Sequence, residues 1–140
     1  MNSKNAVYTG FRFEAEGFPA FAVINKDVKS LADRFDYNYA VFIDIVPLEY
    51  DEVGHPEGEE YDYLLDVEKK MIEEIEEEGV TIHIGHTTLS LKREIIFYTK
   101  APEKVEAFLQ AYLPTIKREA AFEIVEDNRW ENVEGFYEQL

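Results

Sequence analysis

The sequence predicts an α+β fold in which helices cover an antiparallel sheet with a ferredoxin-like core. Segments with the apolar patterns of strands interleave with segments of helical apolar spacing. Between Tyr39 and Asp127 their order is strand, helix, strand, strand, helix, strand, the order of a ferredoxin-like β-α-β-β-α-β unit. A length of 140 residues with 46% hydrophobic residues fits one domain, 1–140, whose core spans 39–127.

The N-terminal region is predicted to form a β-hairpin and a short helix before this core. Residues 8–25 comprise two segments rich in Phe and Val around Glu16-Gly17, a composition typical of a hairpin. A helix of about two or three turns should follow, with Asp27 as its N-cap. Its apolar stripe would be Val28, Leu31 and Phe35.

The first half of the predicted core contains a central strand and a long helix. Tyr39 to Leu48 is nearly continuous apolar sequence, as expected for a strand buried on both faces. After the loop 51–60, a helix runs from Glu60 to about Glu78, with Gly79 as its stop. The apolar stripe expected on this helix is Tyr61, Leu64, Leu65, Met71, Ile72 and Ile75.

The second half of the predicted core ends in a C-terminal helix. Residues 80–87 and 89–99 make a second hairpin, and a helix between Pro102 and Pro114 follows. Residues 122–125 form a short last strand. Asn128 and Glu131 fit a capping box, which begins a terminal helix with Trp130, Val133 and Tyr137.

The charge excludes some partners. Fourteen Lys and Arg residues against thirty Asp and Glu residues give a formal net charge of −16. Nucleic-acid binding depends on Lys and Arg contacts to phosphates, so we expect no nucleic-acid partner, and the same field repels an anionic membrane. A basic protein is the partner that this charge would attract; the alternative is that the acids serve solubility alone.

Sequence signatures of catalysis, cofactors and export are absent. There is no cysteine, no nucleophile elbow and no Gly-rich phosphate loop, so we expect no catalytic residue, cofactor or metal. The N-terminal residues 1–5 lack the apolar region of a signal peptide, and no segment has the roughly 18 apolar residues of a membrane span. A cytoplasmic location is expected. Association into a homo-oligomer, through sheet edges or through the exposed sheet face, is left open.

Three short motifs in the second half resemble a bacterial protein family. The motifs are Ile84-Gly85-His86-Thr87, Arg93-Glu94-Ile95-Ile96-Phe97-Tyr98 and Asp127-Asn128-Arg129-Trp130, with Tyr137 after them. They resemble the Gly strand, the Arg-Glu-aromatic strand and the C-terminal Asp-x-x-Trp segment of the domain-of-unknown-function 695 family. The resemblance spans most of the chain and implies a fold and a location. It implies no catalytic residue, because that family has no settled activity.

Histidines raise the question of a metal site. His83 and His86 lie three residues apart on one predicted strand, which places them on opposite faces unless a bulge intervenes. His55 lies in the acidic loop beside Glu57, Glu59 and Glu60, which together offer nitrogen and oxygen ligands to a divalent ion. The alternative is that these loop acids are simply solvated, because no EF-hand spacing is present.

Charged and aromatic residues on the predicted sheet form a second candidate site. Asp44 is the one charge inside an apolar strand, and either faces water or needs a partner. Arg93 and Glu94 on the neighbouring hairpin would supply a structural ion pair; alternatively, Asp44 and Glu94 act as an acid/base pair in a pocket. We expect Tyr98, Trp130 and Tyr137 to be core anchors rather than ligand stackers.

An acidic run ends the long predicted helix. Its members are Glu73, Glu74, Glu76, Glu77 and Glu78. Like charges three and four residues apart, near a helix C-terminus, lower helix stability. The run is either a solvated face or a surface that Lys69, Lys70, a cation or a basic partner neutralises.

Two functional hypotheses follow. The favoured one is a non-enzymatic protein-binding or regulatory module whose acidic helix docks on a basic protein. The alternative is a small-molecule-binding protein or small enzyme that uses the open sheet face, and it requires a concave pocket with perturbed pKa values. Its candidate ligand-binding residues are Asp44, His83, His86, Arg93, Glu94, Tyr98 and Trp130.

Overall fold

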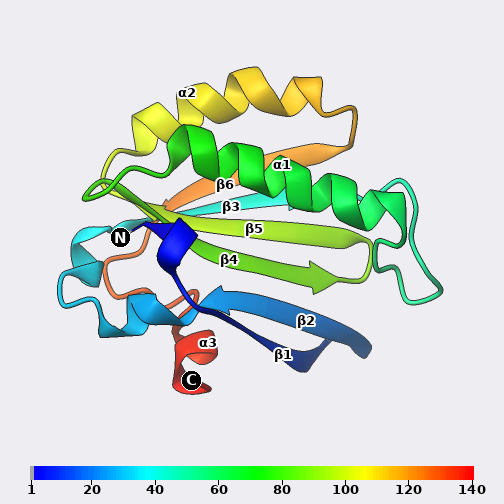
Figure 1. Ribbon diagram of the computed structural model, residues 1–140, viewed down its shortest axis with the longest axis horizontal. Coiled ribbons are helices and arrows are strands. Elements are labelled where there is room, and N and C mark those ends of the chain that lie inside the picture. The colour runs from blue at the N-terminus through cyan, green and yellow to red at the C-terminus, as the bar shows by residue number, and fades with distance from the viewer. Residues whose placement is uncertain (1) are drawn as a thin grey trace.

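A computed structural model describes residues 2–140 and shows, within that range, one six-stranded antiparallel sheet and three α-helices (Figure 1). The α+β class is therefore confirmed. The strands are β1 (Tyr8–Ala15), β2 (Phe18–Asn25), β3 (Tyr39–Ile45), β4 (Thr81–Leu89), β5 (Lys92–Thr99) and β6 (Ala120–Glu126). The helices are α1 (Glu59–Ile75), α2 (Pro102–Tyr112) and α3 (Glu134–Glu138).

The strand order is β1-β2-β4-β5-β3-β6, and every neighbouring pair is antiparallel. The predicted chain order of β3, α1, β4, β5, α2 and β6 is observed. The sheet nevertheless differs from that of a simple ferredoxin-like fold, because β2 pairs with β4 and the β1–β2 hairpin thereby adds two strands to the sheet. The apolar segments between residues 8 and 25 are thus part of the main sheet.

α1 and α2 cover the same face of the sheet (Figure 1). Inward residues of α1 recur at helical spacing and pack on apolar residues of β3 and β5. The buried set on α1 is Glu60, Leu64, Val67, Glu68, Met71 and Ile75. The predicted stripe is correct for its central residues, whereas Tyr61 is 46% exposed.

α1 ends at Ile75, three residues before the predicted end. The backbone of Glu76 is extended, with φ −69° and ψ 131°, and its side chain turns inward. Glu76 Oε1 accepts hydrogen bonds from the backbone N and the hydroxyl of Ser3 at 3.0 and 2.7 Å, and Oε2 accepts from His83 N at 3.2 Å. With its backbone extended and its carboxylate bonded to Ser3 and His83, Glu76 does not continue the helix.

The opposite face of the sheet carries a second apolar core. Side chains of β2, β4 and β5 pack there on the N-terminal connection and on the C-terminal segment. Trp130, Val133 and Tyr137 are its buried C-terminal members, so the prediction that these aromatics anchor a core agrees with their burial.

The two predicted terminal helices are shorter than expected and have different caps. Two 3-10 segments, Lys26–Ser30 and Arg34–Asp36, replace the first helix, and the Asn25 side chain rather than Asp27 caps the former. At the other end the predicted Asn128 cap is wrong. Asp127 accepts from Glu131 N and Asn132 N, at 2.9 and 3.1 Å, and α3 begins later.

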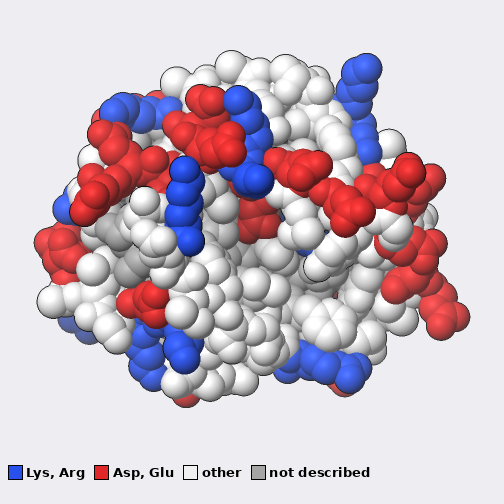
Figure 2. Space-filling view, viewed as in Figure 1, with Lys and Arg blue, Asp and Glu red and all other residues white. Residues whose placement is uncertain are grey.

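Surface charge is unevenly distributed. Figure 2 shows acidic side chains gathered over α1 and at both of its ends, while the surface over β1 and β2 is mostly uncharged. Within residues 2–140 no helix has the length and apolar character needed to cross a bilayer.

A β-bulge in β4 is the main irregularity of the sheet. The register between β4 and β5 shifts between His83 and Gly85. Gly85 has a φ of +144°, and a Cβ built there would lie 1.9 Å from the carbonyl oxygen of Val23 on β2. Only glycine fits this backbone position.

Replacement of Gly85 by Ala should therefore destabilise the protein by about 3 kcal/mol or more, because backbone atoms of β2 would have to move. Urea unfolding followed by circular dichroism measures this loss. Gly135→Ala is the matched control, because a Cβ there meets nothing within 4 Å. A Gly85→Ala midpoint equal to that of the control would contradict this account of the bulge.

Candidate functional site

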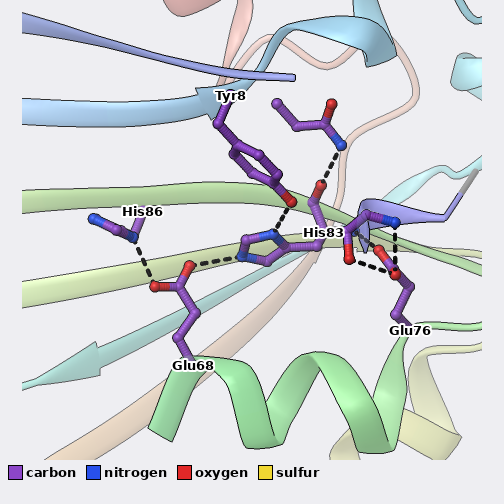
Figure 3. A network of polar contacts seen from close by, with 7 residues as sticks. Tyr8, Glu68, Glu76, His83 and His86 are labelled. Atoms are coloured by element: carbon purple, nitrogen blue, oxygen red, sulfur yellow. Dashed lines mark hydrogen bonds and ion pairs between the residues drawn. The ribbon is translucent and has the colours of Figure 1, made fainter. Parts of the chain in front are cut away.

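A buried hydrogen-bond network lies between α1 and the sheet (Figure 3). Glu68 Oε2 is 2.7 Å from His83 Nε2, and Glu68 Oε1 is 2.7 Å from His86 Nδ1. The hydroxyl of Tyr8, on β1, is 2.6 Å from His83 Nδ1. One carboxylate from α1 is thereby joined to two histidines of β4 and a tyrosine of the N-terminal strand.

The bulge explains why both histidines point toward α1. Without it, the spacing of three would place His83 and His86 on opposite faces, as the alternation of a regular strand predicts. The extra residue at Ile84-Gly85 restores a common face. The expectation of opposite faces is therefore wrong for this strand, for the reason that a bulge intervenes.

The protons of the network can be arranged without conflict. With the Tyr8 hydroxyl donating to His83 Nδ1, the His83 Nε2–H and the His86 Nδ1–H donate to the two Glu68 oxygens. Burial alone would raise the pKa of Glu68, but the hydrogen bonds from both histidines outweigh it and hold that pKa far below its usual range. Glu68 is thus a buried, ionised carboxylate.

Arg93 lies in the same layer, on β5. Its side chain is fully buried, and its Nε and Nη1 atoms have no hydrogen-bond partner within residues 2–140. The guanidinium lies 5.8 Å from the ring centre of Tyr61. Burial lowers the pKa of Arg93, while the negative charge of Glu68 opposes this shift. The predicted ion pair between Arg93 and Asp44 is not formed. Asp44 lies opposite Glu94 in the sheet, and Arg93, as the neighbour of Glu94 in β5, faces the other side of the sheet.

Asp44 and Glu94 lie on the opposite, open face, directly across from each other in the β3–β5 register. With Lys92, whose Nζ is 3.4 Å from Asp44 Oδ2, they line a hollow of about 420 Å³. Burial and the negative charge of Asp44 raise the pKa of Glu94 to about 7. Two of the seven predicted ligand-binding residues thus share a concave site.

Tyr98 and Trp130 lie in a third place, within the second core. The Tyr98 hydroxyl donates to Asp127 at 2.6 Å, and its ring lies 4.2 Å from that of Trp130. Burial raises the pKa of Tyr98, and the hydrogen bond to Asp127 adds to the shift. The seven predicted residues therefore divide among the layer under α1, the open face and the second core.

The acidic loop does not converge on His55. His55 Nε2 is 2.8 Å from the carbonyl oxygen of Pro19, and Glu60 forms a two-point ion pair with Arg118, at 2.7 and 2.9 Å. Across residues 2–140 no group of three His, Asp or Glu side chains is arranged to hold a metal ion. The hypothesis of a loop metal site has no supporting geometry.

The predicted acidic surface differs at one position. Glu73, Glu74, Glu77 and Glu78 are exposed. Glu76 is half-buried and bonded to Ser3 and His83, so it contributes structure rather than surface charge.

Neither Glu68 nor Tyr8 was predicted from the sequence as a member of a site. Glu68 carried a signal, because it lies at helical spacing between Leu64 and Met71, on the apolar side of α1. An acidic residue on that side predicts a buried partner. Tyr8 carried no comparable signal, because its contact with His83 depends on how β1 and β2 join the sheet.

Glu68→Gln should lower the free energy of unfolding by about 2–4 kcal/mol. A glutamine has one acceptor oxygen, so its NH2 group would face the N–H of one histidine. Urea unfolding at neutral pH measures the loss. A control at an exposed glutamate of the same helix, Glu73→Gln, should change the midpoint little. Equal midpoints for the two variants would show that the network contributes nothing.

Glu94→Gln should stabilise the protein at high pH. The pKa of Glu94 is raised in the folded state from 4.5 to about 7. The contribution of Glu94 to the free energy of unfolding is therefore fully present below about pH 4.5, where the carboxyl is protonated in both states. It is lost as the pH rises through about 7, because the carboxyl must then ionise in a buried place beside Asp44. The variant should gain roughly 1–3 kcal/mol at about pH 8 and little at about pH 4. Unfolding midpoints at both pH values measure this, and a gain independent of pH would contradict it.

Comparison with known protein families agrees with the resemblance predicted from the motifs. A family described as "Family of unknown function (DUF695)" matches residues 8–137, which include all four members of the buried network. Neither the curated proteins nor the solved structures compared with the chain gave a match. The chain belongs to the DUF695 family of unknown function.

Proposed function

We propose that this protein is a non-enzymatic binding or regulatory module that docks on a basic protein through the outward side of α1. The observation that carries the proposal is the set of exposed carboxylates along α1 and the turn after it. Its members are Glu59, Asp62, Asp66, Glu73, Glu74, Glu77 and Glu78, which we call the acidic face. Their gathering in one region, within a chain of net charge −16, complements a basic surface (Figure 2).

Few of these charges are neutralised within the chain. Among residues 2–140, only two members of the acidic face form ion pairs: Lys70 with Glu74 at 2.9 Å and Lys104 with Glu77 at 3.3 Å. Both pairs are exposed, so water screens them and each contributes little to stability. Repulsion among the remaining carboxylates costs stability. A basic partner would remove that cost on binding.

The inward side of α1 holds the acidic face in a fixed orientation. Glu68 is bonded to both histidines, and Glu60 is bonded to Arg118 and to the backbone N of Leu48. A helix held by buried polar bonds loses little backbone conformational entropy when a partner binds. This supports recognition by α1 as a rigid element.

Exposed aromatic side chains border the acidic face. Tyr61 is 46% exposed and Phe21 is 38% exposed. The register places Phe21 opposite Thr88 and Thr88 opposite Arg93, whose guanidinium lies beside the Tyr61 ring. Both aromatics therefore lie at the same end of the helix-covered side. Aromatic residues beside charges are typical of protein-binding surfaces.

The test is binding by variants of equal charge. Glu73, Glu74, Glu77 and Glu78 are changed to Gln in one variant, and the exposed residues Glu14, Glu16, Glu119 and Glu131 are changed to Gln in the control. A protein retained by the wild type at about 50 mM NaCl is identified, purified and titrated with each form. We expect the α1 variant to lose about tenfold or more in affinity and the control to lose far less.

Salt gives the second readout, because attraction between the acidic face and a basic partner is screened. The wild-type affinity should fall about tenfold or more between about 50 and 300 mM NaCl. Retention of no protein, equal losses in both variants, or an affinity independent of salt would each overturn the proposal.

A second candidate function rests on the hollow of the open face. Its volume of about 420 Å³, with Asp44 and Glu94 across from each other, supports binding of a small cationic molecule. Asp44 Oδ1 has no hydrogen-bond partner in residues 2–140, so within that range the ion pair of Lys92 with Oδ2 is the one compensation of this carboxylate's charge. A panel of small amines should raise the melting temperature of the wild type but not of Asp44→Asn. Equal shifts in both would remove this candidate.

The proposal extends to the fold. Strands β3 to β6, together with α1 and α2, form the ferredoxin-like part, and the β1–β2 hairpin is an addition to it. The adjacency β4-β5-β3-β6 and the placement of both helices on one face support this assignment.

A further inference from the structure

A separate pocket of about 280 Å³ lies on the side of the sheet opposite α1 and α2. It is formed where the 3-10 segments Lys26–Ser30 and Arg34–Asp36 meet the C-terminal segment, close to α3 in Figure 1. The side chains that line it include Lys29, Arg34, Phe35, Arg129, Trp130 and Tyr137.

Aromatic rings form the apolar part of this pocket. Trp130 is 2% exposed, and its indole N–H donates to the carbonyl oxygen of Tyr37 at 2.8 Å. Phe35 is 48% exposed, and its ring lies 6.2 Å from that of Trp130 at an interplanar angle of 87°. A fixed indole beside an open phenyl ring makes a site that suits a flat, apolar group.

Trp130 has an unusual backbone conformation at this place. Its φ is +58°, in the left-handed region that bulky residues rarely adopt. The Asp127 carboxylate holds the turn by accepting from Glu131 N, Asn132 N and the Tyr98 hydroxyl. Strain retained by surrounding bonds is found often at ligand sites.

The charges in the pocket differ from those of the rest of the protein. Three cationic side chains, Lys29, Arg34 and Arg129, line it in a chain whose net charge is −16. None of them forms an ion pair within residues 2–140. The pocket therefore carries three cationic side chains against two acidic ones, Glu134 and Glu138.

Arg34 connects the cationic and aromatic parts. Its guanidinium lies 4.8 Å from the ring centre of Phe35, 5.9 Å from that of Trp130 and 5.8 Å from that of Tyr137. In the described part of the chain its side chain makes one hydrogen bond, from Nη1 to the carbonyl oxygen of Lys29 at 3.0 Å. Its other N–H groups are free to donate to a carboxylate.

We propose that this pocket binds a small planar aromatic carboxylate, with its ring against the exposed Phe35 ring, beside the buried Trp130, and its carboxylate toward Arg34 and Lys29. The volume suits one or two fused rings. Glu134 and Glu138 also line the pocket. Their charges disfavour a polyanion and leave a single carboxylate as the matching charge.

The probe for this proposal is 2-naphthoate, titrated into the full-length protein. Trp130 is the single tryptophan, so one indole N–H signal in a proton–nitrogen NMR spectrum reports directly on the pocket. That signal should shift with saturation, at a Kd of about 0.1–1 mM for a probe of this size. The uncharged analogue 2-naphthalenemethanol should bind about tenfold more weakly.

Some variants should weaken the binding of 2-naphthoate and others should strengthen it. Arg34→Met and Lys29→Met should each weaken 2-naphthoate binding about fivefold or more, while Arg12→Met, which removes a guanidinium stacked on Phe21 outside the pocket, should not. Glu134→Gln with Glu138→Gln should strengthen binding severalfold. The Lys29 and glutamate variants replace exposed side chains, so they keep the test valid if Arg34→Met disturbs the fold.

Three results would overturn the proposal. They are no saturable indole shift at about 10 mM 2-naphthoate, equal affinity for the uncharged analogue, and affinities unchanged in the Lys29 and glutamate variants. The four-residue α1 variant should bind 2-naphthoate like the wild type, because the acidic face lies on the other side of the sheet. The two proposals can therefore fail independently.

Discussion

One buried carboxylate bonds α1 to the sheet beneath it. Glu68 is 5% exposed, and an ionised carboxylate at that depth is costly unless hydrogen bonds replace its lost water. Two histidines supply those bonds, and they share a face only because β4 bulges at Gly85. Glycine permits the bulge, since any Cβ would meet the backbone of β2. A single irregularity in a strand therefore lets both histidines bond the helix that packs above it.

The orientation of α1 decides which of its carboxylates face water. With Glu60 and Glu68 turned inward and bonded, the other carboxylates of α1 are left on its outward side. On the far side of the sheet, the second core holds Trp130 against a pocket with free cationic groups. The sheet thus separates an acidic, helical surface from an aromatic, cationic pocket. The two surfaces suit ligands of opposite charge.

The amino-acid pattern was sufficient to predict the six strands and the helices α1 and α2. The strands are apolar segments bounded by turn residues, and each of the two helices has apolar residues at helical spacing over several turns. The short terminal elements were predicted less well, because local side-chain bonds decide them. Asn25 rather than Asp27 caps the first 3-10 segment, and Asp127 rather than Asn128 bonds the backbone of the turn before α3. The site was predicted in part. His83, His86, Arg93 and Glu94 were identified as candidates, but their grouping depends on a bulge and on strand alternation. The carboxylate that joins the histidines comes from a helix with many similar acids, where composition does not distinguish one glutamate from another.

A carbon-13 NMR pH titration of the side-chain carboxyl of Glu68, assigned by its absence in Glu68→Gln, measures whether this buried carboxylate is ionised and held by the two histidines. We expect this carboxyl to stay ionised while the exposed glutamates take up protons, because hydrogen bonds from two histidines hold its pKa far below the usual range. Its signal should remain constant until the fold itself is lost in acid. A titration of Glu68 together with the exposed glutamates, in protein that is still folded, would contradict the claim that this ionised carboxylate bonds α1 to the sheet.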